Sequence, residues 1–260
     1  MMVCILCGGY GTRIRDVADN IPKPMIPIGG YPILWHIMKY YARWDHNKFV
    51  LCLGYKGDSI RDFFINLRSH TTDMTIDLSG KNPIEYHNAE TVENWNVTLA
   101  ETGMNAMTGA RLKRVKKYLC NEENFMLTYG DGVGNIDIQK LLDFHKSHGK
   151  ILTVTGVRPP GRFGELQYNN MGLVTEFNEK YQSIGGRISG GFFVCRNEIF
   201  NYINDREDTP FEQEPLRNLI TDGEMMVFKH DGYWHPMDTS REYQILNQLY
   251  EQKKAPWVIW

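Results

Sequence analysis

The sequence predicts an α/β protein built on a doubly wound, mixed sheet. Apolar runs that do not alternate with polar residues occur at 3–6, 49–53 and 125–128, as expected of strands buried on both faces. Segments with helical spacing separate these runs, and such alternation of strand and helix is typical of parallel pairing. From residue 151 onward the chain is richer in short strands. We therefore expect a parallel first half that continues into a β-rich second lobe.

The two halves are expected to form one domain. The chain has 260 residues, a length that α/β folds often reach as a single domain. No linker-like stretch and no internal repeat divides the sequence. We predict a single domain over 1–260, with one half at 1–150 and the other at 151–260.

The first strand ends in the glycine-rich segment Gly8-Gly9-Tyr10-Gly11-Thr12-Arg13, and Lys23 follows between two prolines. Glycine lets the backbone approach a ligand closely, and successive N–H groups in such a loop attract phosphate oxygens. The guanidinium of Arg13 matches phosphate geometry, and the ammonium of Lys23 adds a compact charge. The segment predicts a polyphosphate site, with a plain glycine turn beside two solvated cations as the alternative.

The spacing of this loop argues against two common nucleotide motifs. A dinucleotide fingerprint beginning at Gly9 would need a third glycine where Ile14 stands. It would also need an acidic residue roughly twenty positions on, where the chain has Gly29 and Gly30. A kinase-type P-loop needs Gly-Lys-Ser/Thr, and the sequence has no such triplet.

Beyond the glycine loop, apolar residues at helical spacing predict a helix over 32–41, with proline near its first turn. The strand at 49–53 follows, and then a helix near 59–67. Residues from about 70 to 98 contain short alternating pieces separated by turn residues. These pieces predict an antiparallel excursion from the sheet.

A basic helix is expected over 108–118. Its lysines Lys116 and Lys117 are interpreted as part of a solvated face. Arg111 differs because it follows a second glycine loop at 107–110, so we expect it to face the nucleotide.

Two carboxylates suggest a metal site beside the phosphates. Asp131 stands between glycines at the end of the strand that starts at Phe125, and Asp238 stands just before the last predicted helix. An aspartate in a turn is often only a local cap. Next to a polyphosphate, however, one or two carboxylates are the usual protein ligands of Mg²⁺. We therefore predict that Asp131 and Asp238 hold Mg²⁺.

The second half is expected to hold strands and helices in alternation. The strands are expected at 152–157, 164–168, 173–178, 188–195 and 225–229, and the helices near 197–204, near 214–222 and from Thr239 onward. The last segment, 255–260, is too apolar for a free tail, so we expect it to pack on the body or on a neighbouring subunit.

Composition narrows the functional classes. Twenty-nine Lys and Arg against 31 Asp and Glu give a net charge of −2, which argues against a nucleic-acid surface. No apolar segment is long enough to span a bilayer, and we expect a soluble, cytoplasmic protein. The C-x-x-C spacing of Cys4 and Cys7 lies in a strand, where residues three apart face opposite sides, so core packing is favoured over a metal. The histidines show no metal-ligand spacing and are interpreted as structural.

Taken together, these motifs resemble the sugar-1-phosphate nucleotidyltransferases, and within them the glucose-1-phosphate cytidylyltransferases. The stretches that carry the resemblance run in order along the whole chain: 8–13, 23–25, 32–38, 54–57, 95–99, 107–111, 128–132, 160–164, 190–194 and 236–239. Such enzymes convert CTP and a sugar 1-phosphate into a CDP-sugar and pyrophosphate. The resemblance implies a Rossmann-like fold and a homo-oligomer.

The resemblance also implies roles for individual residues. The catalytic residues would be Arg13, Lys23, Asp131 and Lys180, and Asp131 and Asp238 would hold Mg²⁺. Nucleotide binding would fall to Leu6, Cys7, Gly8, Gly9, Tyr10, Gly11, Thr12, Arg13, Lys23, Ala106, Thr108, Gly109, Arg111 and Gly130. Sugar-phosphate binding would fall to Tyr129, Gly164, Glu179, Lys180 and Gly191. The substrates would be CTP and glucose 1-phosphate.

Three positions depart from that family pattern. Tyr181 stands where proline is usual, Ser189 where asparagine is usual, and Ala110 where the base loop usually has glycine. The first two would lie in the sugar pocket, so they bear on the choice of sugar more than on the chemistry. One alternative is the same chemistry with a different 1-phosphate or with dTTP in place of CTP. A nucleotide-sensing module without turnover is another. The five residues Arg13, Lys23, Asp131, Lys180 and Asp238 argue against the second, because binding alone would not need all of them.

Overall fold

The computed structural model describes residues 1–14, 16–17, 20–79, 84–87, 93–159, 165–168, 171, 174–178 and 186–260. Its strands are β1 Met2–Leu6, β2 Pro27–Ile28, β3 Tyr31–Pro32, β4 Lys48–Leu53, β5 Met74–Thr75, β6 Glu85–Tyr86, β7 Asn96–Glu101, β8 Asn124–Tyr129, β9 Gly132–Gly134, β10 Leu152–Val157, β11 Glu165–Tyr168, β12 Val174–Asn178, β13 Ile188–Arg196, β14 Met225–His230 and β15 Trp234–Pro236. Its α-helices are α1 Ile33–Ala42, α2 Gly57–Thr71, α3 Thr108–Arg114, α4 Lys116–Leu119, α5 Ile138–His148, α6 Glu214–Thr221 and α7 Ser240–Glu251. Short 3₁₀ turns are η1 Thr12–Ile14, η2 Lys23–Met25 and η4 Asn197–Asn201.

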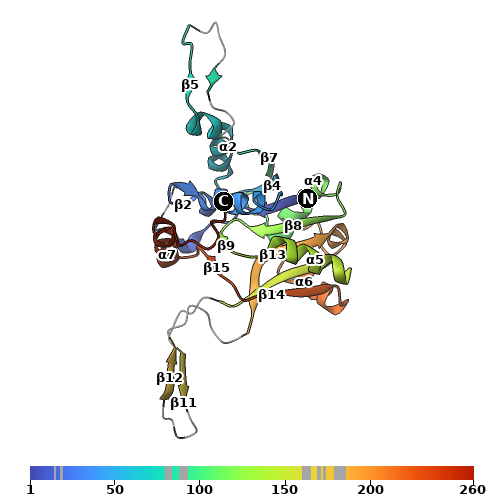
Figure 1. The fold of residues 1–260 in the computed structure, drawn as a ribbon. Coiled ribbons are helices and arrows are strands. Elements are labelled where there is room, and N and C mark those ends of the chain that lie inside the picture. The colour runs from blue at the N-terminus through green and yellow to red at the C-terminus, as the bar shows by residue number, and fades with distance from the viewer. Residues whose placement is uncertain are drawn as a thin grey trace.

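A seven-stranded sheet forms the centre of the protein, in the order β14-β10-β13-β8-β1-β4-β7 (Figure 1). β8, β1, β4 and β7 pair in parallel, and so do β10 and β14. β13 runs antiparallel to both of its neighbours, β8 and β10. The doubly wound, mixed sheet is therefore confirmed. Strands of the second half extend the sheet of the first half on one side.

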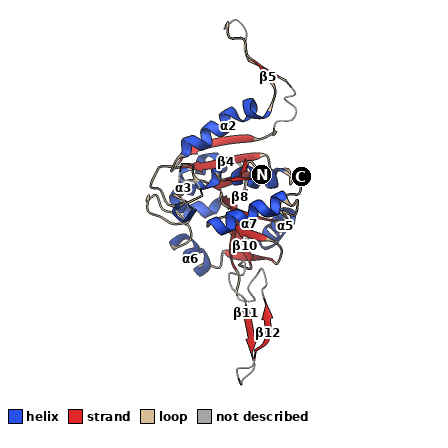
Figure 2. Cartoon of the chain, turned by 90° about the vertical axis from the view of Figure 1, so that its left-hand side faces the viewer, coloured by secondary structure: helices blue, strands red, loops and turns tan. Residues whose placement is uncertain are grey.

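Helices cover both faces of this sheet (Figure 2). Alternate residues of each strand point to opposite faces. Val3 and Ile5 of β1 belong to the apolar cluster that contains residues of α1, α5 and α7. Cys4 and Leu6 belong to the opposite cluster, which contains residues of α3, α4 and α6. All four side chains are buried, which is why the sequence of this strand does not alternate.

Most element predictions of the first half are confirmed, with two corrections. β5 and β6 form the antiparallel excursion, which lies beyond the end of α2, away from the sheet (Figure 1). Residues 96–98, however, belong to β7, which pairs in parallel with β4 at the edge of the main sheet. The basic helix is also divided, because α3 ends at Arg114 and α4 begins at Lys116.

In the second half, the helix expected near 197–204 is the short 3₁₀ turn η4. Helix α5 was not among the predicted elements, although Asp137 caps its first turn by accepting a hydrogen bond from the Lys140 N–H at 2.9 Å. Helix α7 begins at the expected place, behind a capping box formed by Thr239 and Glu242. Among the described residues, none of the helices has both the length and the apolar composition needed to cross a membrane.

The cysteine prediction is confirmed. Cys4 and Cys7 are buried and lie in the apolar clusters on opposite faces of the sheet. The sulfurs of Cys4 and Cys52 are 3.6 Å apart, and all five cysteines of the chain are free. Burial raises the pKa of the Cys7 thiol well above its ordinary value, so this thiol is a packing group rather than a nucleophile.

The C-terminal segment packs on the body, as the sequence predicts. Trp257 is fully buried, and its Nε1–H donates to Nδ1 of His36 at 3.5 Å. The other ring nitrogen of His36 lies 2.8 Å from the carbonyl of Ile28. A carbonyl only accepts, so His36 Nε2 carries the proton and Nδ1 accepts. The neutral imidazole thus joins the end of the chain to the first helix.

This arrangement predicts a loss of stability in mild acid. Burial lowers the pKa of His36 from 6.5 to about 4. A folded-state pKa below the unfolded value means that the stability is fully present above pH 6.5 and is lost as the pH falls toward 4. A shift of one pKa unit corresponds to about 1.4 kcal/mol, so the shift of His36 from 6.5 to about 4 contributes about 3 kcal/mol to that loss. Urea unfolding measured across this pH range gives the slope of the unfolding free energy against pH.

The variant His36→Gln tests the source of that slope, because glutamine can donate and accept without titrating in this range. We expect a shallower dependence of the unfolding free energy on pH than in the native protein. The dependence does not vanish, because burial also lowers the pKa of His145 to about 4. The same slope in both proteins would contradict the assignment.

Candidate active site

A pocket of about 490 Å³ lies where β1 and β8 end in the middle of the sheet. Ligands of open α/β sheets bind outside the carboxyl ends of the strands, and a pocket of this volume suits a small organic ligand. Its lining comprises Leu6, Cys7, Gly8, Gly9, Tyr10, Gly11, Thr12, Ile14, Lys23, Pro24, Asn105, Ala106, Met107, Thr108, Arg111, Tyr129, Gly130, Asp131, Pro210, Glu212 and Asp238. Residues far apart in the sequence therefore meet at one opening.

Most of the residues expected to bind nucleotide line this pocket. Gly109 does not; its N–H donates to the Thr209 carbonyl at 3.0 Å, and a Cβ there would lie 2.8 Å from that oxygen. Arg13 lies in η1, and its side chain is outside the described part of the chain. Gly164, Glu179 and Lys180 are also outside the described residues, so their roles stay predictions.

Two carboxylates and one ammonium meet at one end of the pocket. Lys23 Nζ donates to Asp131 Oδ2 at 2.6 Å and also to Asp238 Oδ1. Burial alone would lower the pKa of Lys23, but the two carboxylates outweigh it and raise that pKa. The lysine is thus held in its charged form.

The β9–β15 ribbon brings the two aspartates together. β9 follows Asp131 directly, β15 ends at Pro236, and the two strands pair antiparallel with Pro236 opposite Gly132. The Met237 N–H then donates to the Asp131 carbonyl at 2.8 Å. The Asp238 N–H donates to Glu242 Oε2 at 2.7 Å, which ties this residue to the start of α7.

This arrangement fits a divalent cation. Two carboxylates converge on one cationic group, as hard-metal ligands do. Among the described residues, no group of three or more His, Cys, Asp and Glu side chains is placed to hold a metal. Oxygens of a bound phosphate would therefore have to complete the coordination, which is the usual way in which proteins bind Mg²⁺.

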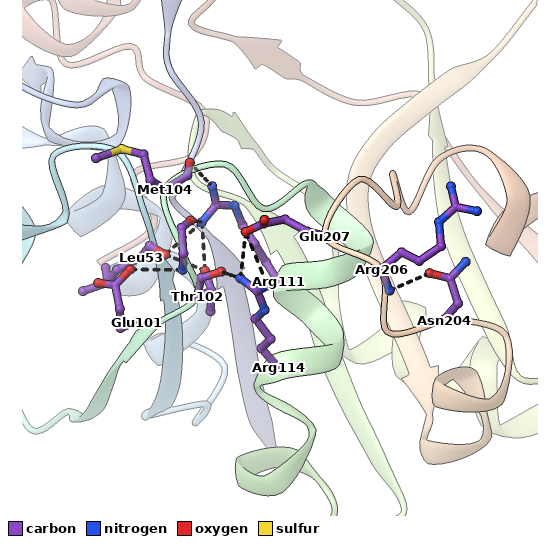
Figure 3. A network of polar contacts seen from close by, with 10 residues as sticks. Leu53, Glu101, Thr102, Met104, Arg111, Arg114, Asn204, Arg206 and Glu207 are labelled. Carbon is purple, nitrogen blue, oxygen red and sulfur yellow. Dashed lines mark hydrogen bonds and ion pairs between the residues drawn. The ribbon is translucent and has the colours of Figure 1, made fainter.

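Arg111 differs from its prediction in what it contacts. Although it lines the pocket, its terminal nitrogens donate to five protein oxygens. Figure 3 shows the contacts with the carbonyls of Leu53 and Met104 and the hydroxyl of Thr102. The other two acceptors are the carbonyls of Gly8 and Gly103. The residue is 4% exposed. Burial lowers its pKa, but an arginine with these acceptors stays charged. Its guanidinium therefore holds together the loops that form the pocket.

This guanidinium also explains a glycine of the glycine loop. A Cβ at Gly8 would lie 2.2 Å from Arg111 Nη1, and a Cβ at Gly54 would lie equally close. Glycine at position 8 is thus needed for packing as much as for access to a ligand. At Gly11 the backbone φ is +59°, a left-handed conformation that favours glycine.

Glu212 is a pocket residue that sequence reasoning missed. Its carboxylate accepts hydrogen bonds from the Tyr129 hydroxyl and, at 2.6 Å, from the Thr108 hydroxyl. Burial and the Glu212 carboxylate raise the pKa of Tyr129 well above its ordinary value. Glu212 joins the end of β8 to the start of α3. It stands in no motif, so no signal in the sequence marks it.

The residues expected around the sugar are only partly brought together. Tyr129 lines the pocket, and Gly191, with φ +72°, leaves room for its ring, since a Cβ there would lie 2.4 Å from Cδ2. Ser189, one of the three departures from the family pattern, accepts a hydrogen bond from the Gly191 N–H at 3.4 Å. Ser189 therefore contacts the part of β13 that faces Tyr129.

Comparison with known proteins gives consistent matches along the whole chain. A profile of the nucleotidyl transferase family matches residues 2–253. The chain is 48% identical over 260 residues to a glucose-1-phosphate cytidylyltransferase of Salmonella typhimurium, with 100% of both chains covered. It is 40% identical over 260 residues to a probable glucose-1-phosphate cytidylyltransferase of Bacillus subtilis, again with both chains fully covered. The crystal structure of HddC from Yersinia pseudotuberculosis matches with a TM-score of 0.67 and 25% identity, covering 96% of this chain and 99% of that one.

Proposed function

Because the chain belongs to the nucleotidyl transferase family, we propose that it makes CDP-glucose and pyrophosphate from CTP and α-D-glucose 1-phosphate. Full-length identity to glucose-1-phosphate cytidylyltransferases supports the choice of substrates. The observation that carries the catalytic part is the convergence of Asp131 and Asp238 on the Lys23 ammonium beside the glycine loop. A site for polyphosphate binding needs cationic groups and metal ligands in this combination.

The chemistry of the substrates decides what the protein has to supply. A phosphate oxygen of the sugar 1-phosphate is already anionic and needs no general base. Its difficulty is to approach an α-phosphorus that is surrounded by negative charge. Positioning and neutralisation of charge therefore account for catalysis, as in phosphoryl transfer generally. No covalent intermediate on the protein is required, which agrees with the buried, inert thiol of Cys7.

The chain's own residues share this task in our proposal. The N–H groups of the glycine loop and the side chains of Arg13 and Lys23 bind the triphosphate and stabilise the departing pyrophosphate. Lys180 binds the sugar phosphate and orients its oxygen for in-line attack, and Glu179 binds sugar hydroxyls. Asp131 and Asp238 would hold a divalent ion, Mg²⁺ in our proposal, which supplies positive charge to the phosphates when bound.

Three further parts of the proposal concern the protein as a whole. Strands β10, β13 and β14 continue the first sheet, which supports one domain over 1–260. Five free cysteines support the cytoplasm, where thiols stay reduced. Exposed apolar side chains on and beside the β5–β6 excursion, which include Met74, Ile76, Leu78 and Ile84, support a homo-oligomer.

A panel of nucleotides and sugar 1-phosphates tests the proposed activity. Pyrophosphate release is measured for CTP, dTTP, UTP, GTP and ATP, each with glucose 1-phosphate and with other hexose 1-phosphates, in Mg²⁺. We expect the highest kcat/KM for CTP with glucose 1-phosphate. The Asp131→Asn protein, purified in the same way, controls for contaminating enzymes.

Each other outcome of the panel has a definite meaning. A higher kcat/KM with dTTP, or with another 1-phosphate, would overturn the assigned substrates and leave the chemistry in place. Binding of CTP without pyrophosphate release from any pair would overturn catalysis and favour a nucleotide-sensing module.

A further inference from the structure

Lys23 holds a position that the proposed metal would also need. Its ammonium donates to both Asp131 and Asp238, and its side chain is only 11% exposed. The carboxylates themselves are 34% and 17% exposed, so they are screened less than surface groups. The lysine acts here as a monovalent cation bound between two carboxylates.

We propose that Lys23 is an internal competitor of the divalent metal, so that the metal binds tightly only when nucleotide phosphates draw the ammonium away from the aspartates. This inference rests on the proposed function, since it assigns the same two carboxylates to the metal. It adds a regulation of that site: metal and nucleotide bind cooperatively, through one side chain that has two sets of partners.

The Lys23 ammonium and a divalent metal would compete for the same two carboxylates. An ammonium and a divalent ion that take the same two carboxylates repel each other at short distance, and burial strengthens that repulsion. Either the metal stays weakly bound or the ammonium leaves. The Lys23 ion pairs to both aspartates are the arrangement that the structure holds.

The Lys23 ammonium has an alternative place to go, because its side chain can move while its backbone cannot. The backbone of Lys23 is fixed in η2, where the Met25 N–H donates to the Pro22 carbonyl at 2.8 Å and the Ile26 N–H donates to the Lys23 carbonyl at 3.1 Å. Only the side chain is therefore available for movement. Its stem lies against the glycine loop, since a Cβ at Gly11 would be 3.2 Å from the Cβ of Lys23. A polyphosphate in that loop is thus an alternative partner within reach of the same flexible side chain.

Linkage makes this coupling reciprocal. If the nucleotide raises the affinity for the metal by a certain factor, the metal must raise the affinity for the nucleotide by the same factor. A lysine that only holds the fold together would give no such coupling. A lysine that only binds phosphate would leave the metal affinity of the free protein unchanged when it is removed.

The test measures binding and needs no turnover. The full chain is titrated with Mn²⁺ without nucleotide, and the concentration of free Mn²⁺ is measured from its electron paramagnetic resonance signal. Lys23→Met keeps an apolar stem and removes the charge. We expect it to bind Mn²⁺ at least tenfold more tightly than the native protein. Lys146→Met removes an exposed lysine of α5 and changes the net charge equally, and we expect it to leave the affinity unchanged.

A second measurement separates competition from a structural role. The affinity for the preformed Mn²⁺·CTP complex is followed by water-proton relaxation, and we expect it to fall at least tenfold in Lys23→Met. Removal of Lys23 thus moves the two affinities in opposite directions, whereas damage to the fold would lower both. Lys23→Gln is measured in parallel, so that the result does not depend on how one variant folds.

The inference is overturned if neither variant binds free Mn²⁺ more tightly than the native protein, or if Lys146→Met gains as much. It is also overturned if both affinities fall together. These failures are distinct from a failure of the proposed function, which the native protein alone decides through pyrophosphate release. A native protein that makes CDP-glucose while Lys23→Met gains no Mn²⁺ affinity would reject the competition alone.

Discussion

Asp131→Asn is expected to lower kcat for pyrophosphate release by about a thousandfold, which corresponds to roughly 4 kcal/mol of transition-state stabilisation. Asparagine has nearly the same shape but no charge, so the site keeps its volume and loses one of its two carboxylates. The partner Asp238 and the Lys23 ammonium remain, so the loss concerns the divalent ion that both aspartates are proposed to hold. Initial rates with saturating CTP, glucose 1-phosphate and Mg²⁺ measure the effect.

Asp143→Asn is the matched control for this prediction. It makes the same change at an exposed carboxylate of α5, where Oδ1 accepts a hydrogen bond from Gln139 at 2.9 Å. We expect its kcat to equal that of the native protein. If Asp131→Asn turned over at a rate near the native one in Mg²⁺, Asp131 would have no place in the catalytic site.

Arg111→Met is expected to lower the free energy of unfolding by about 3 kcal/mol, because hydrogen bonds to a charged group contribute about 1.5–3 kcal/mol each and the cost of burying the guanidinium offsets part of their sum. Methionine fills part of the space but donates no hydrogen bond. The carbonyls of Gly8, Leu53, Gly103 and Met104 then lose the group that joins them. Gly8 and Leu53 keep backbone donors in Tyr55 and Thr102, so what is lost is the set of charge-assisted hydrogen bonds between the loops. Urea denaturation at constant pH measures the change.

The same substitution should weaken nucleotide binding, because Arg111 holds the Gly8 loop against the Leu53 strand end. Calorimetric titration with CTP measures this second effect. Arg217→Met, at an exposed arginine of α6, serves as the control and should change the unfolding free energy by less than about 0.5 kcal/mol. A loss below about 1 kcal/mol in Arg111→Met would show that the network contributes little.

Local sequence patterns were sufficient to predict much of the fold. The runs at Val3, Phe49 and Phe125 do not alternate, because both faces of β1, β4 and β8 are buried, and that property is visible in the sequence. The start of α7 was equally visible, because Thr239 and Glu242 form a cap within a few residues. Helix α5 shows the limit of this reasoning, since it was not predicted even though a capping aspartate precedes it.

In the site, sequence reasoning found the groups whose chemistry is marked by a motif. The glycine loop, Lys23, Asp131 and Asp238 line one pocket, as expected of a polyphosphate site. It did not find Glu212, and it gave Arg111 an incomplete role. Glu212 contacts Tyr129 from 83 positions away and Thr108 from 104, so no local spacing could reveal these contacts.

The sequence by itself determined the strands, the glycine loop and the types of residue that handle phosphate, because those depend on neighbours a few positions apart. Only the tertiary structure decided the partners of the charged groups. Lys23 lies between carboxylates 108 and 215 positions away, and Arg111 reaches carbonyls of separate loops. The physical reason is that the energy of a buried charge depends on the atoms around it in space. Those atoms are brought together only when β9 pairs with β15 and α3 packs beside β1.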